Sequence, residues 1–106
     1  MEFRYIVVLV TVNSEETAEK ITEALLDSHK AACVNIVQDV DSHYWWKGKK
    51  ESAEESLLII KTRAELLDDV VKLVKANHPY SVPEIIALPI IGGNEDYLKW
   101  IDEETR

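Results

Sequence analysis

The sequence predicts an α+β domain whose strands and helices follow the order β-α-β-β-α-β, with one further helix at the end. Two stretches, residues 4–12 and 56–62, are densely apolar and rich in β-branched or aliphatic side chains, as expected of central strands covered on both faces. Each is followed by a segment whose apolar residues recur at helical spacing. The chain has 106 residues, so we expect a single domain over residues 1–106.

The first strand and the first helix together occupy residues 4–28 in this prediction. The strand has the sequence RYIVVLVTV at residues 4–12. Asn13 follows it, with Glu16 three residues later, which is the spacing of a capping box at the start of a helix. Apolar residues then fall on one face of this helix up to about Ser28.

A long hairpin is predicted to follow the first helix. Residues 31–40 (AACVNIVQDV) alternate between apolar and polar side chains well enough for a strand. Residues 44–50 (YWWKGKK) then turn at Gly48 toward a returning strand. The hairpin would therefore carry three consecutive aromatic residues near its tip.

The second half repeats the strand and helix of the first half. Residues 56–62 (SLLIIKT) form a strand, and Thr62 with Glu65 is predicted to form a second capping box. The helix that this box would open stops at residues 77–79. Its apolar stripe comprises Leu66, Leu67, Val70, Val71, Leu73 and Val74.

The last strand and the last helix complete a recognisable topology. Residues 83–91 (PEIIALPII) form the fourth strand, which we expect at a sheet edge because Pro89 has no amide hydrogen to donate. A short helix begins after residues 92–94. This order of elements is that of a ferredoxin-like sandwich, and right-handed crossovers place the first and third strands at its centre.

Both faces of the predicted sheet are apolar. Val8 and Leu9 point to opposite faces of the first strand, and Leu58 and Ile59 do the same in the third. The two helices between the strands lie on one face only, and the short terminal helix is too small to cover the other. We therefore expect the second face to pack against other copies of the chain in a closed oligomer.

Charge and composition exclude several classes of partner. The formal net charge is −8, so the field of the chain repels phosphate backbones, and we expect no nucleic-acid partner. The longest apolar runs are far below the roughly 20 residues that cross a bilayer, so we expect no membrane span. The lone cysteine, Cys33, allows no internal disulfide, and the first residues lack an apolar signal region. Together these features predict a cytoplasmic protein.

Five segments match one family pattern almost position by position. They are AACVNI at residues 31–36, YWWKG at 44–48, IIKT at 59–62, HPYSVPEIIALPI at 78–90 and GNEDYLKW at 93–100. In these segments the chain resembles the CutA family of divalent-cation tolerance proteins, and the resemblance covers essentially the entire chain. It implies a ferredoxin-like domain that forms a tight homotrimer with sheets joined between subunits. It also implies a role in tolerance to divalent cations, notably copper.

A metal site is the first functional candidate. The chain holds three histidines and 20 acidic residues, and imidazole with carboxylate suits Cu(II). His78 and Glu84 form the best local pair, because the loop between them ends at Pro83 and would fold the carboxylate back toward the imidazole. In the alternative interpretation, His78 caps the second helix and Glu84 is a solvated strand residue.

The resemblance both supports and weakens this metal site. Some bacterial relatives have a proposed copper set with a cysteine near the end of the first strand and paired histidines. This chain has Val10 and Asn77 at those positions, so only His78 and Glu84 carry over. We therefore expect Cu(II) or another divalent cation to bind weakly, unless subunits share the ion.

The aromatic residues of the hairpin are the second candidate. Tyr44, Trp45 and Trp46 are expected to pack in an interface between subunits, because aromatic residues are enriched in interface cores. The alternative function is a trimeric signalling or interaction module that binds a small ligand or a protein partner in clefts between subunits. Tyr44, Trp46, Lys61 and Tyr80 would contribute to those clefts.

No pattern of catalytic residues emerges from the sequence. Residues 11–14, which follow the first strand, hold neither the CxxC pair of a soft-metal chaperone nor the arginine that an acylphosphatase needs. The third strand carries aliphatic residues where an RNA-recognition domain would carry aromatic ones. We therefore predict a protein that is not an enzyme.

Overall fold

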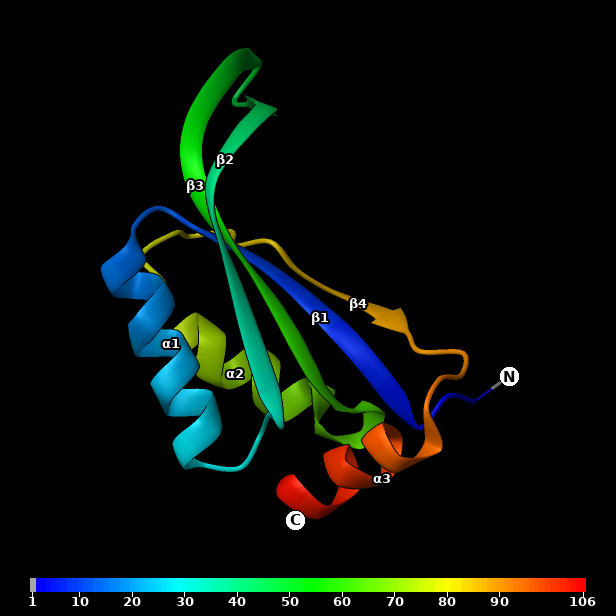
Figure 1. The fold of residues 1–106 in the computed structure, drawn as a ribbon. Helices are drawn as coiled ribbons and strands as arrows, with labels where there is room; N and C mark the ends of the chain where they lie inside the picture. The colour runs from blue at the N-terminus through cyan, green and yellow to red at the C-terminus, as the bar shows by residue number, and fades with distance from the viewer. Residues whose placement is uncertain (1) are drawn as a thin grey trace.

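The computed structural model describes residues 2–106 and contains a four-stranded antiparallel sheet. The strands lie in the order β2-β3-β1-β4, so β1 and β3 are central as the sequence predicts (Figure 1). Their bounds are β1 (Tyr5–Val12), β2 (Cys33–Trp46), β3 (Lys49–Arg63) and β4 (Ile85–Pro89). The predicted α+β class and strand order are therefore confirmed.

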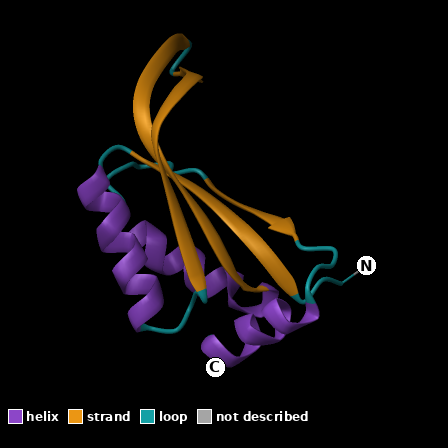
Figure 2. Cartoon of the chain, in the orientation of Figure 1, coloured by secondary structure: helices purple, strands orange, loops and turns teal. Residues whose placement is uncertain are grey.

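Two helices cover one face of this sheet, and a third lies across its end. The first two are α1 (Glu15–Asp27) and α2 (Leu67–Asn77), which pack side by side (Figures 1 and 2). The third, α3 (Glu95–Glu104), lies beside the end of β3 and close to the N-terminal end of β1. Apart from α3, whose Tyr97 lies near Cys33 at one end of it, no helix among residues 2–106 lies on the opposite face of the sheet.

The core lies between the sheet and the first two helices. Burial alternates strictly along β1, and every second residue from Ile6 to Val12 is buried. These side chains pack with Leu58 and Ile60 of β3 and with buried residues of α1 and α2. The helical residues are Ala18, Ile21, Leu25, Val70 and Val74.

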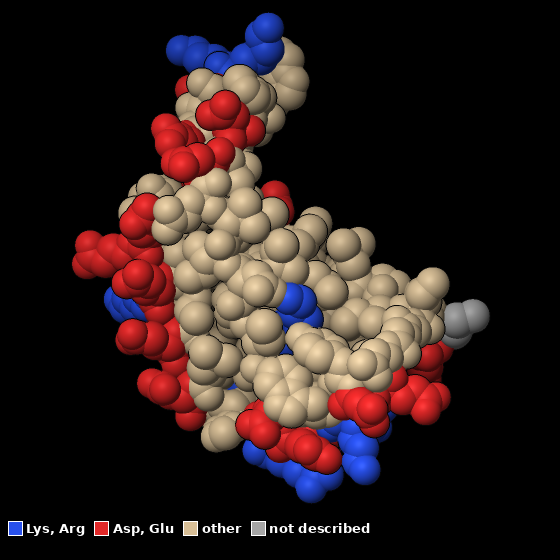
Figure 3. Space-filling model, viewed as in Figure 1, with Lys and Arg blue, Asp and Glu red and all other residues tan. Residues whose placement is uncertain are grey.

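The open face of the sheet is also apolar but remains accessible. Val7, Leu9 and Ile59 are half-buried on it, while Ile86 and Leu88 of β4 are 51% and 49% exposed. Figure 3 shows few charged side chains over the middle of this side of the molecule, whereas acidic side chains gather along its margin. The single chain therefore has the predicted second apolar face, which the helices on the other side of the sheet do not cover.

The hairpin of β2 and β3 projects well beyond the helices (Figure 1). Its turn lies at Lys47 and Gly48, whose φ angles are 50° and 80°. Two positive φ angles in a two-residue turn match the twist of the flanking strands and suit glycine. The turn predicted at Gly48 is confirmed. A register shift between Val37 and Val40 interrupts the strand pairing nearer the body of the molecule.

The structure corrects both predicted helix caps. The cap of α1 is Ser14, whose hydroxyl accepts from the amide of Thr17 at 3.1 Å, and not Asn13. Thr62 does not cap α2, because it lies inside β3 and its buried hydroxyl donates to the carbonyl of Lys30 at 2.6 Å. The chain instead enters α2 through the 3₁₀ turn Ala64–Leu66.

The other strand bounds also differ from the prediction. The first strand of the hairpin continues to Trp46, because pairing with β3 extends well beyond residue 40. Conversely, β4 is shorter than residues 83–91. Pro89 is its last residue, and β4 pairs with β1 alone, so the expected edge position is confirmed.

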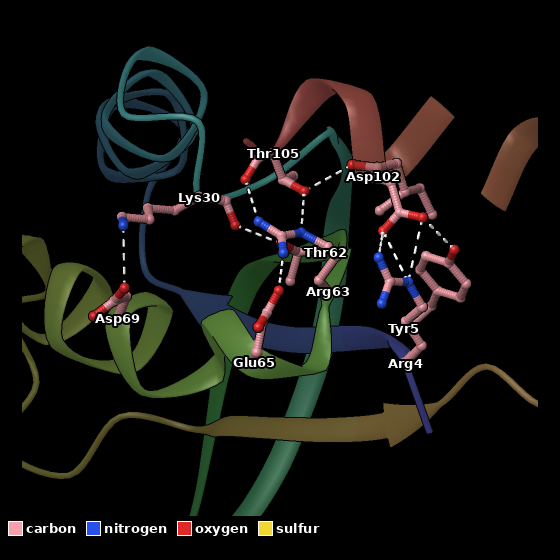
Figure 4. A network of polar contacts seen from close by, with 10 residues as sticks. Arg4, Tyr5, Lys30, Thr62, Arg63, Glu65, Asp69, Asp102 and Thr105 are labelled. Carbon is pink, nitrogen blue, oxygen red and sulfur yellow. Dashed lines mark hydrogen bonds and ion pairs between the residues drawn. The ribbon is translucent and has the colours of Figure 1, made fainter. Parts of the chain in front are cut away.

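Polar side chains fasten α3 to the ends of the central strands (Figure 4). Arg63 donates from Nε to the Thr105 hydroxyl at 2.8 Å and from Nη2 to the Thr105 carbonyl at 2.5 Å. Asp102 accepts from the Tyr5 hydroxyl at 2.6 Å and pairs with Arg4 at 2.8 Å. Burial raises the pKa of Asp102, but the bonds from Tyr5 and Arg4 outweigh this effect and hold the pKa below its ordinary value.

Candidate functional site

A pocket of about 620 Å³ lies where the hairpin leaves the body of the molecule. Its walls come from four segments that are distant in the sequence, namely β1, β2, β3 and the loop before β4. The lining residues are Thr11 of β1, Ser42, His43, Tyr44 and Trp46 of β2, Glu55 of β3, and Tyr80, Ser81, Val82 and Glu84 of the loop. The volume is within the range of about 300–1,000 Å³ that is typical of small-molecule sites. The base of the hairpin is therefore the candidate site.

A buried carboxylate lies in the wall of this pocket. Glu55 is only 7% exposed, and its Oε2 accepts from the Tyr80 hydroxyl at 2.8 Å. Burial of Tyr80, the hydrogen bond to Glu55 and the negative charge of Glu55 all raise the pKa of the Tyr80 phenol far above its ordinary value. Tyr80 therefore remains a protonated donor, and Glu55 is the acceptor.

His78 holds the loop that carries Tyr80. Its Nδ1 lies 3.2 Å from the amide nitrogen of Tyr80, and its Nε2 lies 2.8 Å from the carbonyl oxygen of Thr11. An amide N–H can only donate and a carbonyl can only accept, so Nδ1 is the acceptor and Nε2 carries the hydrogen. Both ring nitrogens are engaged, and the ring also packs against that of Tyr80 at 4.6 Å between centroids.

The predicted metal pair is divided between two environments. Glu84 is exposed and lines the pocket, whereas the buried His78 is absent from the pocket wall. Among residues 2–106, no three His, Cys, Asp or Glu side chains are grouped closely enough to hold a metal ion. A cation at His78 would first have to displace one of the two hydrogen bonds of the imidazole, so this pair stays a prediction.

Three of the predicted cleft residues do share the pocket. Tyr44, Trp46 and Tyr80 all line it, and the first two are each 43% exposed. Alternate residues of a strand point to the same side, so Tyr44 and Trp46 face the pocket together. Trp45 is 70% exposed and is not part of the wall.

Lys61 lies on the open face of the sheet and not in the pocket. Its ammonium donates to the side-chain carbonyl of Asn35, and Cys33 is its neighbour across β2 and β3. The Cys33 sulfur makes a weak contact of 3.8 Å with the same Asn35 oxygen. Burial raises the pKa of the nearby Tyr97, and Cys33 raises it further. The cleft predicted for Lys61 is thus not formed by the single chain.

Known proteins resemble this chain over nearly its whole length. The model of the CutA1 divalent ion tolerance protein family matches residues 6–104. The chain belongs to the CutA1 family. A divalent-cation tolerance protein CutA from Thermus thermophilus is 50% identical over 99 residues, which cover 93% of this chain and 96% of the relative. The solved structure from that organism has a TM-score of 0.94 and 48% identity, and covers 96% of this chain and 99% of its own.

The plant members of the CutA1 family are longer proteins. The chloroplastic CutA 1 of rice is 52% identical over 101 residues, which cover 95% of this chain but 57% of the relative. The chain thus spans little more than half the length of this plant relative. The solved structure of rice CutA1 has a TM-score of 0.95 and 51% identity, and it covers 98% of this chain and 95% of that chain. The matched part is therefore the same domain.

Sequence reasoning missed Glu55 and most of the polar wall around it. Glu55 stands in the run AEES before the apolar part of β3 and has the appearance of a solvated residue. Its burial depends on β2 and on the loop that brings Tyr80 over it. The one available signal is its place next to Ser56, where β3 begins to be buried. That signal identifies no ligand for this member of the CutA1 family.

Proposed function

We propose that this chain acts in divalent-cation tolerance, copper included, as a non-enzymatic metal-responsive binding protein that works as a homotrimer in the cytoplasm. Membership of the CutA1 divalent ion tolerance family carries the proposal. The net charge of −8 supports it, because an acidic protein attracts cations. A relative from Archaeoglobus fulgidus is named as a periplasmic protein. Cell fractionation therefore tests the proposed compartment, and recovery of the protein outside the cytoplasmic fraction would contradict it.

The open face of the sheet supports the trimer. Exposed Ile86 and Leu88 adjoin half-buried Val7 and Leu9 on β1, and nothing within residues 2–106 buries these four side chains completely. An apolar surface of this kind is stabilised when copies of the chain bury it. The edge strands β2 and β4 each have one side free to pair between subunits. Multi-angle light scattering should give about three times the chain mass of 12.1 kDa, and a monodisperse monomer or dimer would contradict the proposal.

Copper binding is proposed at His78 and Glu84. Because both ring nitrogens of His78 are engaged, binding must release either the Tyr80 amide or the Thr11 carbonyl. We therefore expect weak binding that is accompanied by a change in aromatic fluorescence near Tyr80. Copper stands above the other first-row divalent ions in the usual affinity order, so preference for it alone is not diagnostic.

Calorimetric titration with Cu(II) tests these two ligands. Glu84→Gln should weaken binding, and Glu23→Gln, an exposed change on α1, should leave it unaltered. His78→Ala should remove most of the binding, with circular dichroism used to verify that the variant is folded. If Glu84→Gln and a folded His78→Ala both bind Cu(II) with unchanged affinity and stoichiometry, this site is wrong.

A second candidate function is favoured by the pocket at the base of the hairpin. It is a trimeric signalling or interaction module that binds a small ligand or a protein partner, with Tyr44, Trp46 and Tyr80 among its contacts. The support for it is the shared location of these three residues in a pocket of about 620 Å³. Titration with a metabolite panel, in the absence of divalent metal, separates this function from the first.

A further inference from the structure

The charges in the pocket wall at the base of the hairpin all favour a cation. Two carboxylates, Glu55 and Glu84, line the pocket, and its wall contains no lysine or arginine; His43, counted as neutral at pH 7, is its other titratable group besides tyrosine. Lys47 lies 6.0 Å from the centre of the Trp46 ring but does not belong to the wall. An anionic ligand would meet like charge on entering, whereas a cation would be attracted.

Glu55 is buried without a cationic partner. It is 7% exposed, and the ion pairs found among residues 2–106 involve other carboxylates, namely those of Glu65, Asp69 and Asp102. Tyr80 supplies a single hydrogen bond to one of its two oxygens. A buried carboxylate is costly unless charges and donors satisfy it, and it has lone pairs for several donors. The second oxygen of Glu55 is not itself buried, because the one buried side-chain polar atom without a partner among residues 2–106 is Thr22 Oγ1. A positively charged ligand in the pocket would pair with this oxygen.

The other walls suit an organic cation better than a bare or hydrated metal ion. Tyr44, Trp46 and Tyr80 bring aromatic rings to the same pocket, and Val82 adds apolar surface. Aromatic rings attract ammonium groups through their π-electrons, and alkylated ammonium groups lose little on leaving water. Metal ions instead require several grouped ligands, and residues 2–106 contain no such group.

We propose that this pocket binds an organic ammonium cation, with Glu55 as its counter-ion and the side chains of Tyr44, Trp46 and Tyr80 as its aromatic walls. The proposal rests on the second candidate function, ligand binding at the base of the hairpin, and adds the chemical class of the ligand. The volume of about 620 Å³ leaves room for a group attached to the ammonium centre, as in a small metabolite. Tyr80 positions Glu55 by donating to one oxygen and leaves the other oxygen for the ligand.

Three compact probes with the same bulk and different charge test the class of ligand. Tetramethylammonium is positive, tert-butanol is neutral and pivalate is negative, and each is titrated into the intact protein at constant ionic strength while tryptophan fluorescence is recorded. We expect saturable binding of tetramethylammonium with an affinity at least about tenfold above that of tert-butanol, and no saturable binding of pivalate. If tert-butanol or pivalate binds as tightly as tetramethylammonium, or tetramethylammonium does not saturate, the proposal is overturned.

A matched pair of variants tests the counter-ion. Glu55→Gln removes the charge but keeps an oxygen that accepts from Tyr80, and it should weaken tetramethylammonium binding about tenfold while leaving tert-butanol unchanged. Glu54→Gln makes the same charge change at the adjacent residue, which is outside the pocket wall, and should leave both unchanged. If both variants weaken tetramethylammonium binding equally, the overall negative charge of the protein attracts the cation, and the specific role of Glu55 is overturned.

The two proposals fail in different ways. If the ligand class is wrong but the pocket is a binding site, the neutral probe binds at least as well as the ammonium and Trp46→Leu weakens it. If the pocket is not a ligand site, none of the three probes saturates and Trp46→Leu changes no titration. Should Glu55→Gln fail to fold, the comparison of the three probes on the wild-type protein still decides the class of ligand.

Discussion

Substitution of Arg63 by methionine should release α3 from the sheet while leaving the core intact. Arg63 has a side chain only 16% exposed, and its two hydrogen bonds to Thr105 hold the end of α3 against β3 (Figure 4). Methionine keeps most of the aliphatic stem and removes the guanidinium. The carbonyl and hydroxyl of Thr105 would then lose their donors in a place that water reaches poorly, because Thr105 is 2% exposed.

The size of the effect follows from the two bonds that are lost. A hydrogen bond with a charged donor contributes about 1.5–3 kcal/mol, and two bonds between the same pair of residues are not fully additive. We therefore expect α3 to open more easily by about 2–3 kcal/mol, which is an increase of about 30- to 150-fold in the population of its open state. The ion pair of Arg63 with Glu65 adds little, because Glu65 is 65% exposed.

Hydrogen–deuterium exchange of a peptide that covers residues 95–104 measures this opening directly. Arg63→Met should speed exchange in α3 by the factor given above, while peptides from β1 should keep their protection. Glu65→Gln serves as the control, since it removes only the exposed ion pair, and it should change exchange by less than about threefold. The reasoning is refuted if Arg63→Met leaves exchange in α3 within twofold, roughly, of the wild type, or if Glu65→Gln has the same effect.

Three further predictions concern assembly, acid stability and a buried hydroxyl. Trp45→Ala should weaken the trimer by about 2–4 kcal/mol if this exposed ring is an interface anchor, and light scattering on dilution should then show dissociation that the wild type lacks. Because the pKa of Asp102 is lowered in the folded chain, its contribution to stability is present above the ordinary carboxyl pKa and is lost as pH falls below about 4. Urea unfolding between pH 7 and pH 3 should therefore show a smaller loss of stability for Asp102→Asn than for the wild type, and equal losses would contradict the assignment. Thr62→Val should cost about 1–3 kcal/mol in urea unfolding, because the partly buried carbonyl of Lys30 loses its donor, whereas Thr62→Ser keeps the donor. An equal cost for both variants would show that packing dominates.

Local patterns in the sequence predict much of the fold. The continuous apolar run of β1, the apolar stripe of α2 and Gly48 in the hairpin each depend on neighbours within a few positions, and each predicts its element correctly. The family could also be recognised from the sequence, because contiguous motifs such as residues 78–90 carry it. The excess of apolar surface on the open face follows from the same continuous run, because successive residues of a strand point to opposite faces.

The candidate site depends on contacts that no local pattern contains. Thr62 with Glu65 has the spacing of a capping box, yet pairing with β1 carries β3 through Thr62 to Arg63 and directs the hydroxyl to Lys30. Glu55 has the appearance of a solvated acid until the chain brings Tyr80 to it across 25 positions. Here tertiary packing overrides local preference, because burial makes an unsatisfied polar group costly.

The sequence by itself determined the α+β topology, the hairpin turn, the family and the presence of two apolar sheet faces. Only the tertiary structure decided that both ring nitrogens of His78 form hydrogen bonds, one with Thr11 and one with Tyr80. It also decided that the buried Glu55 lines the same pocket as Tyr44 and Trp46. The physical reason is the range of the interactions. Hydrophobic periodicity acts over a few residues, whereas the protonation, burial and partners of a polar side chain are set by whichever distant segments fold against it.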